Sequence, residues 1–65
     1  LNVHPVDLYL EHDETRSIFE ITLTAAERGE SFVGIRYADG QIEMNPRGMS
    51  EYTAARGDGF IVVSE

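Results

Sequence analysis

The stretch SFVGIRYADGQIEMN, residues 31–45, decides the fold of this 65-residue chain. Apolar and polar residues alternate on both sides of Asp39-Gly40, which is the pattern of two half-buried strands joined by a tight turn. A two-residue Asp-Gly loop fits a type I′ turn, in which both central residues have positive φ. Such a turn fixes the pairs that face each other across the hairpin, namely Ala38–Gln41, Tyr37–Ile42, Arg36–Glu43 and Ile35–Met44.

This register predicts which side chains of the hairpin face the core. One face collects apolar residues, which are Ile35, Tyr37, Ile42 and Met44. On the other face Arg36 lies opposite Glu43, where an ion pair contributes a few tenths of a kcal/mol. Because a slip by one residue would move every side chain to the wrong face, we expect the register to be strongly specified.

Upstream of the hairpin, residues 17–28 fit either a strand or a helix. Apolar residues alternate with Glu and Thr as they do in a strand, and β-branched residues disfavour a helix. The flanking signals favour a helix, since Ser17 can cap it and Glu20 completes a capping box. Gly29 then supplies a stop after the last apolar residue. We therefore predict a helix over residues 17–28.

The ends of the chain add two further strands. Residues 6–11, VDLYLE, alternate cleanly and predict a half-buried strand after a lead-in at residues 1–5. Residues 60–64, FIVVS, are apolar on both faces and predict an inner strand covered on both sides or a strand sandwiched at a subunit contact. A loop precedes that strand, with a single helical turn expected at residues 50–54.

These elements define one small domain over residues 1–65. The predicted fold class is α+β, a small mixed or antiparallel sheet with one helix packed on it. The chain begins with leucine instead of methionine, so we expect it to be a fragment of a longer protein. Sixty-five residues are near the lower limit for an independent hydrophobic core, and a partner copy could complete it.

The composition excludes several classes of partner. Acids outnumber bases twelve to five, which gives a net charge of −7 and argues against nucleic acid and anionic lipid as partners. The chain has no cysteine, so it forms no disulfide and no cysteine-based zinc site, and this favours an intracellular setting. Its longest apolar run, residues 60–63, is too short to cross a bilayer.

Glu11, His12, Asp13 and Glu14 form the densest group of potential metal ligands. Carboxylates suit a divalent cation such as Ca²⁺ or Mg²⁺, and an imidazole suits a transition metal. Consecutive side chains point in different directions, so the favoured alternative is a solvated acidic loop before a helix. No nucleophile–histidine–acid arrangement can be deduced, and we expect no enzymatic activity.

Arg56-Gly57-Asp58 spells the tripeptide that cell-adhesion receptors recognise. A phosphate-binding loop is excluded because a strand follows these residues, whereas such a loop needs a helix N-terminus. The favoured alternative to adhesion is a tight turn in which Gly57 and Gly59 adopt unusual φ values. Asp58 would then accept backbone N–H bonds within that turn.

The segments RGESFVGIRY, IEMNP and RGDGFIVVSE together resemble the C-terminal, TrkA-C-like lobe of RCK domains, which regulate potassium conductance. The likeness is greatest to Castor/Pollux-type ion channels and their bacterial relatives, and it covers residues 17–65, ending on the acidic Glu65. The turn is shorter than the connection we expect in plant channels, which points to a bacterial-type relative. The turn and motif residues are Gly29, Gly34, Asp39, Gly40, Asn45, Pro46, Gly57 and Asp58.

This resemblance implies a regulatory, gating lobe of a potassium channel or cation transport protein, at the cytoplasmic face of the membrane. It implies a homodimer of the lobe and a parent chain that also contains a Rossmann-like lobe and a membrane pore. A divalent cation or small regulatory ligand is the implied effector, although no residue here matches a ligand motif. The fragment itself would not contact the membrane. The alternative is a small, non-catalytic protein-interaction module unrelated to channels.

Overall fold

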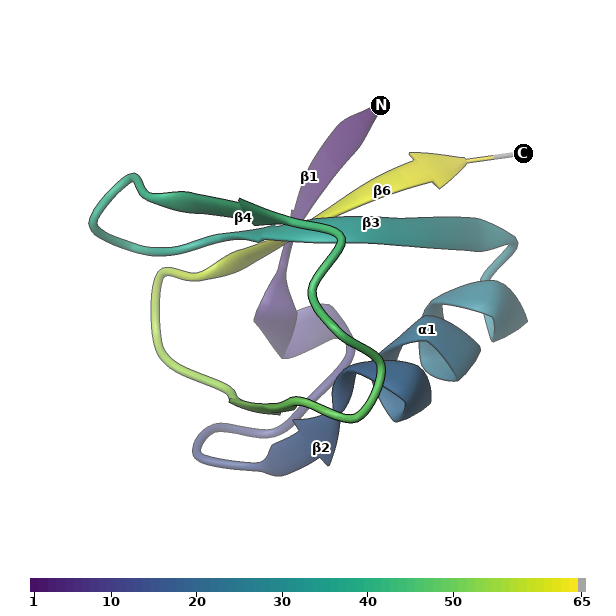
Figure 1. The fold of residues 1–65 in the computed structure, drawn as a ribbon. Coiled ribbons are helices and arrows are strands. Elements are labelled where there is room, and N and C mark those ends of the chain that lie inside the picture. Colours follow the sequence, from purple (N-terminus) through teal and green to yellow (C-terminus); the bar gives the residue numbers. More distant parts are fainter. Residues whose placement is uncertain (65) are drawn as a thin grey trace.

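A four-stranded antiparallel sheet forms the centre of the domain, and one α-helix packs on one of its faces (Figure 1). The computed structural model describes residues 1–64, so the predicted acidic end of the last strand, Glu65, lies outside the described residues. The elements in chain order are β1 (Asn2–Pro5), the 3-10 turn η1 (Val6–Leu8), β2 (Thr15–Ser17), α1 (Ile18–Glu27), β3 (Glu30–Arg36), β4 (Ile42–Met44), β5 (Glu51–Thr53) and β6 (Gly59–Ser64). The predicted α+β fold class is confirmed.

The strand order β1-β6-β3-β4 makes β6 an inner strand, as predicted. Strands β2 and β5 form a separate antiparallel pair. In Figure 1 the helix, η1 and this pair all lie on the same side of the four-stranded sheet. The other side of the sheet is left without a covering element among residues 1–64.

Helix α1 confirms the prediction for residues 17–28. The Ser17 hydroxyl accepts the Glu20 N–H at 3.1 Å, and the Glu20 carboxylate accepts the Ser17 N–H at 3.1 Å, which completes the capping box. Gly29 has φ of +75° and ends the helix. These end signals and the burial of Ile18 and Ile21 outweigh the β-branched residues of the segment.

The hairpin forms where it was predicted, but the predicted register is wrong. Tyr37 donates its N–H to the Gln41 carbonyl at 2.8 Å, so the loop between them has three residues instead of two. Gly40 has φ of +93°, whereas Asp39 has no positive φ, which excludes a type I′ turn and indicates a type I turn followed by a left-handed glycine. The facing pairs are Gly34–Met44, Ile35–Glu43 and Arg36–Ile42.

This shift by one residue turns the side chains of strand β4 toward the opposite face of the sheet. Ile42 and Met44 are exposed on the side of the sheet away from α1, instead of lying in the core. The predicted ion pair between Arg36 and Glu43 does not form, because Glu43 now lies on the helix side. There its carboxylate accepts the Tyr37 hydroxyl at 2.9 Å.

Two further predictions for local structure are wrong. Residues 1–5 contain strand β1, and the predicted strand at residues 6–11 instead begins with the turn η1. Val6 and Leu10 are buried as expected, because one helical turn places residues four apart on the same side, but Leu8 is exposed. Residues 51–53 form strand β5 against β2 and not a helical turn.

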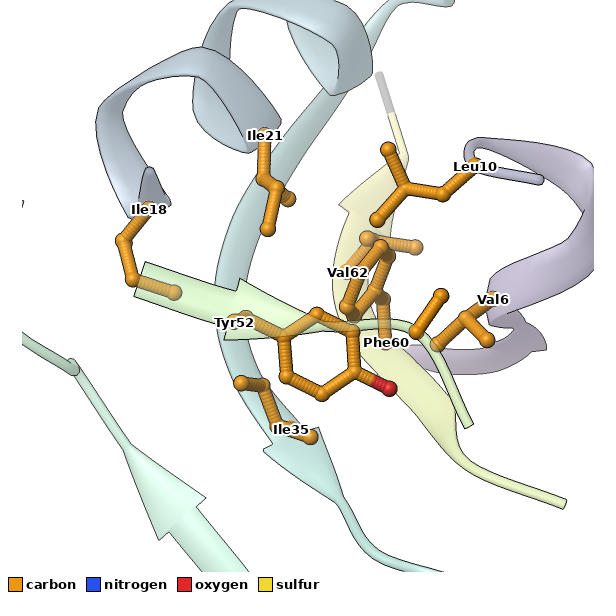
Figure 2. Close-up of a cluster of buried hydrophobic side chains, with 9 residues drawn as sticks. Val6, Leu10, Ile18, Ile21, Ile35, Tyr52, Phe60 and Val62 are labelled. Atoms are coloured by element: carbon orange, nitrogen blue, oxygen red, sulfur yellow. The ribbon is translucent and has the colours of Figure 1, made fainter. Parts of the chain in front are cut away.

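The core lies between the sheet and the elements on its covered side (Figure 2). Phe60 of β6 is at its centre with no exposed surface. Its ring meets those of Tyr9, Phe32 and Tyr52 edge to face, at centroid distances of 5.1, 5.3 and 5.5 Å. The aliphatic residues around it come from every part of the chain and are Val6, Leu10, Ile18, Ile21, Ile35 and Val62.

Candidate functional site

The uncovered side of the four-stranded sheet is the most extensive candidate site. Residues that pair across strands project from the same face of a sheet. The pairing therefore places three rows on this side, one through Val3 and Ile61, one through Gly59 and Ile42, and a short one through Ser31 and Val63. We call it the outer face, and its residues are Val3, Pro5, Ser31, Gly34, Arg36, Ile42, Met44, Gly59, Ile61 and Val63.

Two glycines let side chains lie flat across the outer face. A Cβ at Gly34 would lie 2.9 Å from the Met44 sulfur and 2.8 Å from the Glu43 carbonyl oxygen. A Cβ at Gly59 would lie 2.7 Å from Cγ1 of Val3. Met44 and Val3 therefore lie over the glycines and leave Ile61, between them, only 5% exposed. Gly34 and Gly59 serve this close packing, since neither has a positive φ.

The outer face differs in charge from the rest of the chain. The chain carries twelve acids, yet among the described strand residues that project from this face there is no carboxylate, and at its edge Asp7 of η1 lines a hollow with Val3, Pro5 and Arg36. Arg36 is its one charged group within residues 1–64. Val3, Ile42, Met44 and Val63 are exposed on it. Exposed apolar residues grouped on one face are typical of protein contacts, so the outer face is a candidate interaction surface.

Asp58 of the adhesion-like tripeptide lies inside the domain. It is 7% exposed, and its carboxylate accepts the Ala38 N–H at 2.8 Å and the Tyr52 hydroxyl at 2.5 Å. The donors come from the hairpin loop and from β5, and not from within the turn as expected. Gly57 has φ of +91°, which fits the predicted turn, whereas Gly59 does not have a positive φ. This carboxylate therefore joins two loops and is not presented to solvent.

The acidic stretch from Glu11 to Glu14 does not converge on a common point. The Glu14 carboxylate accepts the Glu11 N–H at 2.9 Å and the Arg16 Nε–H at 2.6 Å, and these contacts lower the pKa of Glu14. His12 Nε2 lies 3.4 Å from an Asp13 carboxylate oxygen. Within residues 1–64 no group of three or more histidines and acids is arranged to hold a metal ion. Glu11, His12 and Glu14 instead line an open groove.

The remaining motif residues shape turns. The Asp39 carboxylate accepts the Gln41 N–H at 2.9 Å, and Gly40 completes the hairpin loop. Asn45 has φ of +51° and donates its N–H to the Val33 carbonyl at 2.8 Å, next to the half-buried Pro46. These residues set the path of the backbone, and no described polar pocket forms around them.

A polar cluster that the sequence interpretation missed lies at one edge of the core. The Glu30 carboxylate accepts the Tyr9 hydroxyl at 2.6 Å and the Arg28 Nε–H at 3.3 Å, and His4 Nδ1 lies 3.2 Å from it. His4 Nδ1 is also 3.0 Å from the Tyr9 oxygen. We call these four residues the His4 cluster. Only the recognition of β1 as a strand would have placed His4 on the same side of the sheet as Phe60.

Hydrogen bonding and burial shift the acidity of groups in and near this cluster. The Tyr9 hydroxyl holds the pKa of Glu30 below its usual value, against the opposing effect of burial. Burial and the hydrogen bond to Glu30 raise the pKa of Tyr9 to about 12. Burial and the Glu43 carboxylate likewise raise the pKa of Tyr37 to about 12, and burial and Asp58 raise that of Tyr52.

We expect all three tyrosines of the folded protein to ionise well above pH 10. The absorbance of tyrosinate at about 295 nm should therefore rise late in an alkaline titration, and near pH 10 once urea has unfolded the chain. Because the folded state binds the phenolic protons more tightly, the free energy of unfolding is unaffected below the unfolded pKa and falls as pH rises through the folded pKa. Tyr9→Phe should remove part of the late absorbance. A tyrosine that titrates at pH 10 in the folded protein would contradict the shifts.

Comparison with known proteins places the chain near ion channels. No protein-family model matches the chain. Over its whole length it is similar in sequence to a segment of a plant ion-channel protein. That protein is Probable ion channel CASTOR from Oryza sativa subsp. japonica, with 33% identity over 67 positions that cover 100% of this chain and 8% of the channel protein. The chain thus spans less than a tenth of this relative.

The similarity corrects one expectation about plant channels. A longer connection was expected there in place of the Asp39-Gly40 turn. The alignment has only two positions more than the 65 residues of this chain, so this plant protein has no long insertion at the turn. Separately, no helix within residues 1–64 combines the length and apolar character needed to span a membrane.

Proposed function

We propose that this chain is a non-catalytic regulatory domain of an ion-channel type of protein and that it self-associates through the outer face. The single observation that carries the self-association is the exposed apolar sheet face, whose described strand residues include no acid, on a chain of net charge −7. The sequence similarity to a segment of a probable ion channel supports the channel context.

A second copy is the occupant that the charge distribution favours. Two acidic chains repel each other over most of their surfaces. The outer face is where they can meet with few carboxylates brought together, and a two-fold interface uses the same patch on both copies. Ile42 and Met44, on the short edge strand β4, would be buried in such a contact. The dimer would also complete the burial of a small core.

In the full protein this domain would act as a gating lobe. It would lie at the cytoplasmic face of the membrane, beside a Rossmann-like lobe and a pore contributed by the rest of the parent chain. A bound divalent cation or small regulatory ligand would change the geometry of the pair and so bias the pore. Such an effector acts only if it binds one of the two geometries more tightly than the other.

We expect Ile42→Glu to convert the dimer into a monomer, because it places a carboxylate within the proposed apolar contact. Sedimentation equilibrium at about 50 μM should show a dimer for the natural sequence. The dissociation constant of the variant should be at least about tenfold larger. Phe19→Glu is the matched control, since Phe19 is 58% exposed on α1 and Ile42 is 59% exposed. Circular dichroism should show both variants folded. A natural sequence that stays monomeric, or equal weakening by both variants, would refute the proposed interface.

A small interaction module unrelated to channels is the second candidate. Phe19 and Leu23 are exposed one turn apart on α1, away from the outer face, and favour a contact with some other protein. The upstream parent sequence separates the two candidates, because transmembrane helices and a Gly-rich βαβ unit there would support the channel context.

A further inference from the structure

We propose that Arg36 of one copy enters a hollow at the edge of the partner's outer face and pairs there with the partner's Asp7. A two-fold axis repeats this contact, so each dimer contains two such ion pairs. The hollow itself belongs to one copy of the chain. Its occupation by a second copy rests on the proposed self-association, and the two charges decide how the copies recognise each other.

The hollow lies where the outer face lacks side chains. Gly59 stands between Pro5 and Arg36 in one row of the sheet, because β6 lies between β1 and β3. Its volume of about 310 Å³ is roughly ten times the share of one water molecule in the liquid, so a guanidinium group fits inside. The other residues that line the hollow are Val3, Asp7, Gly57 and Asp58.

Two opposite charges line the hollow, and neither is neutralised within one copy. Arg36 and Asp7 are both exposed, and every ion pair within residues 1–64 involves other side chains. Asp58 is already engaged, because its two carboxylate oxygens accept the Ala38 N–H and the Tyr52 hydroxyl. Of the acids in the described lining, Asp7 is therefore the one that can take a new partner.

Contact between two outer faces requires a carboxylate beside Arg36. This residue lies between Gly59 and Ile42 in its row, so an apolar contact over the row removes water from the guanidinium. A charge that is buried without a partner strongly disfavours association. A two-fold contact places the partner's outer face opposite, and the available carboxylate of that face is Asp7.

The geometry of one copy favours a carboxylate from the partner. Strand β6 separates β3, which carries Arg36, from β1, which leads into η1 and Asp7. The two side chains form no ion pair within one copy. A two-fold axis through the hollow exchanges its two sides, so that Arg36 of each copy faces Asp7 of the other. Other rotations of the two faces leave the guanidinium groups unpaired, and the charges thus select one orientation.

Charge reversal on separate copies tests this pairing. Arg36→Glu and Asp7→Arg each place like charges across the contact, so each variant alone should have a dissociation constant at least about tenfold larger than that of the natural sequence. In an equimolar mixture, opposite charges face each other at both contacts of the heterodimer. Its dissociation constant should therefore return to within about threefold of the natural value. Sedimentation equilibrium measures the constants, and native mass spectrometry identifies the heterodimer by its mass.

Glu27→Arg and Arg47→Glu are the matched controls. Replacing an acid by a base adds two charges and the reverse removes two, so they change the net charge from −7 to −5 and to −9, as Asp7→Arg and Arg36→Glu do. Glu27 lies on α1, and Arg47 precedes Gly48, whose carbonyl accepts an N–H of that helix. Each control alone should change the dissociation constant by less than about threefold. Circular dichroism should show all four variants folded, because all four side chains are exposed.

The outcomes separate this pairing from the self-association. If the natural sequence dimerises and the mixture associates no more tightly than the single variants, the pairing is wrong and the self-association stands. A contact between Arg36 and Asp7 within one copy gives that result, because each variant keeps its own mismatch. Equal recovery in the control mixture would reveal an effect of net charge and would also overturn the pairing. A natural sequence that stays monomeric at about 50 μM refutes the self-association and the pairing together.

Discussion

Phe60→Ala is expected to lower the free energy of unfolding by about 4 kcal/mol. The Phe60 ring is fully buried and meets three aromatic rings, from β3, β5 and the segment after η1. Truncation removes these contacts and leaves a cavity that elements from all parts of the chain would have to fill. A domain of this size has a total stability of about 3–10 kcal/mol, so the variant should be largely unfolded at 37 °C.

Urea unfolding followed by far-UV circular dichroism measures this loss. Phe60→Leu should cost about 1–2 kcal/mol, because much of the apolar volume is kept. Phe19→Ala removes the same ring from an exposed helix position and should change the stability by less than about 0.5 kcal/mol. A Phe60→Ala protein that unfolds at the same urea concentration as the natural sequence would show that the core is not centred on this ring.

The elements that could be predicted from the sequence are those specified by residues close to them in the chain. Ser17, Glu20 and Gly29 specify the ends of α1 through contacts within one or two turns, and the structure shows all three in those roles. The central place of β6 in the sheet was also predicted, but the cover expected on both of its faces is present within residues 1–64 only on the helix side, and Val63 is exposed on the other. Local chemistry was sufficient for the helix and only in part for β6.

The hairpin register failed because one loop residue decides it. The Asp39-Gly40 pair is compatible with a two-residue loop and with a three-residue loop that ends on a left-handed glycine. Both loops give a hairpin, but the side chains of β4 that face the core in one register face away from it in the other. The predicted register buried Ile42 and Met44 and therefore concealed the outer face. The candidate interface could not be deduced until the loop was known.

The prediction of a strand at residues 6–11 failed for a similar reason. A strand and a helical turn both place Val6 and Leu10 on the same side, since alternate residues share a face of a strand and residues four apart share a side of a turn. The burial of these two residues therefore does not distinguish a strand from a turn. Leu8 does distinguish them, and it is exposed. With residues 6–11 assigned as the strand, β1 was missed, and with it the approach of His4 to Glu30. That contact joins residues far apart in sequence and has no local signature.

Asp58→Ala is expected to lower the free energy of unfolding by about 3 kcal/mol. The substitution leaves two donors, the part-buried Ala38 N–H and the buried Tyr52 hydroxyl, without their acceptor. It also disconnects the hairpin loop from the turn before β6. Equilibrium unfolding in urea measures the loss. Asp39→Ala is the matched control, since its carboxylate accepts one exposed N–H and should contribute about 0.5 kcal/mol.

A double-mutant cycle with Tyr52→Phe assigns the loss to the buried contact. Tyr52→Phe removes the hydroxyl donor and should cost about 1–2 kcal/mol in the natural background. In the Asp58→Ala background it should cost much less, because the hydroxyl has already lost its acceptor. Additive losses would mean that the two groups act independently, contrary to the 2.5 Å contact. A strong coupling would show that Asp58 in the Arg-Gly-Asp tripeptide is retained for folding, since a carboxylate that joins two loops from inside the domain cannot also be offered to a receptor.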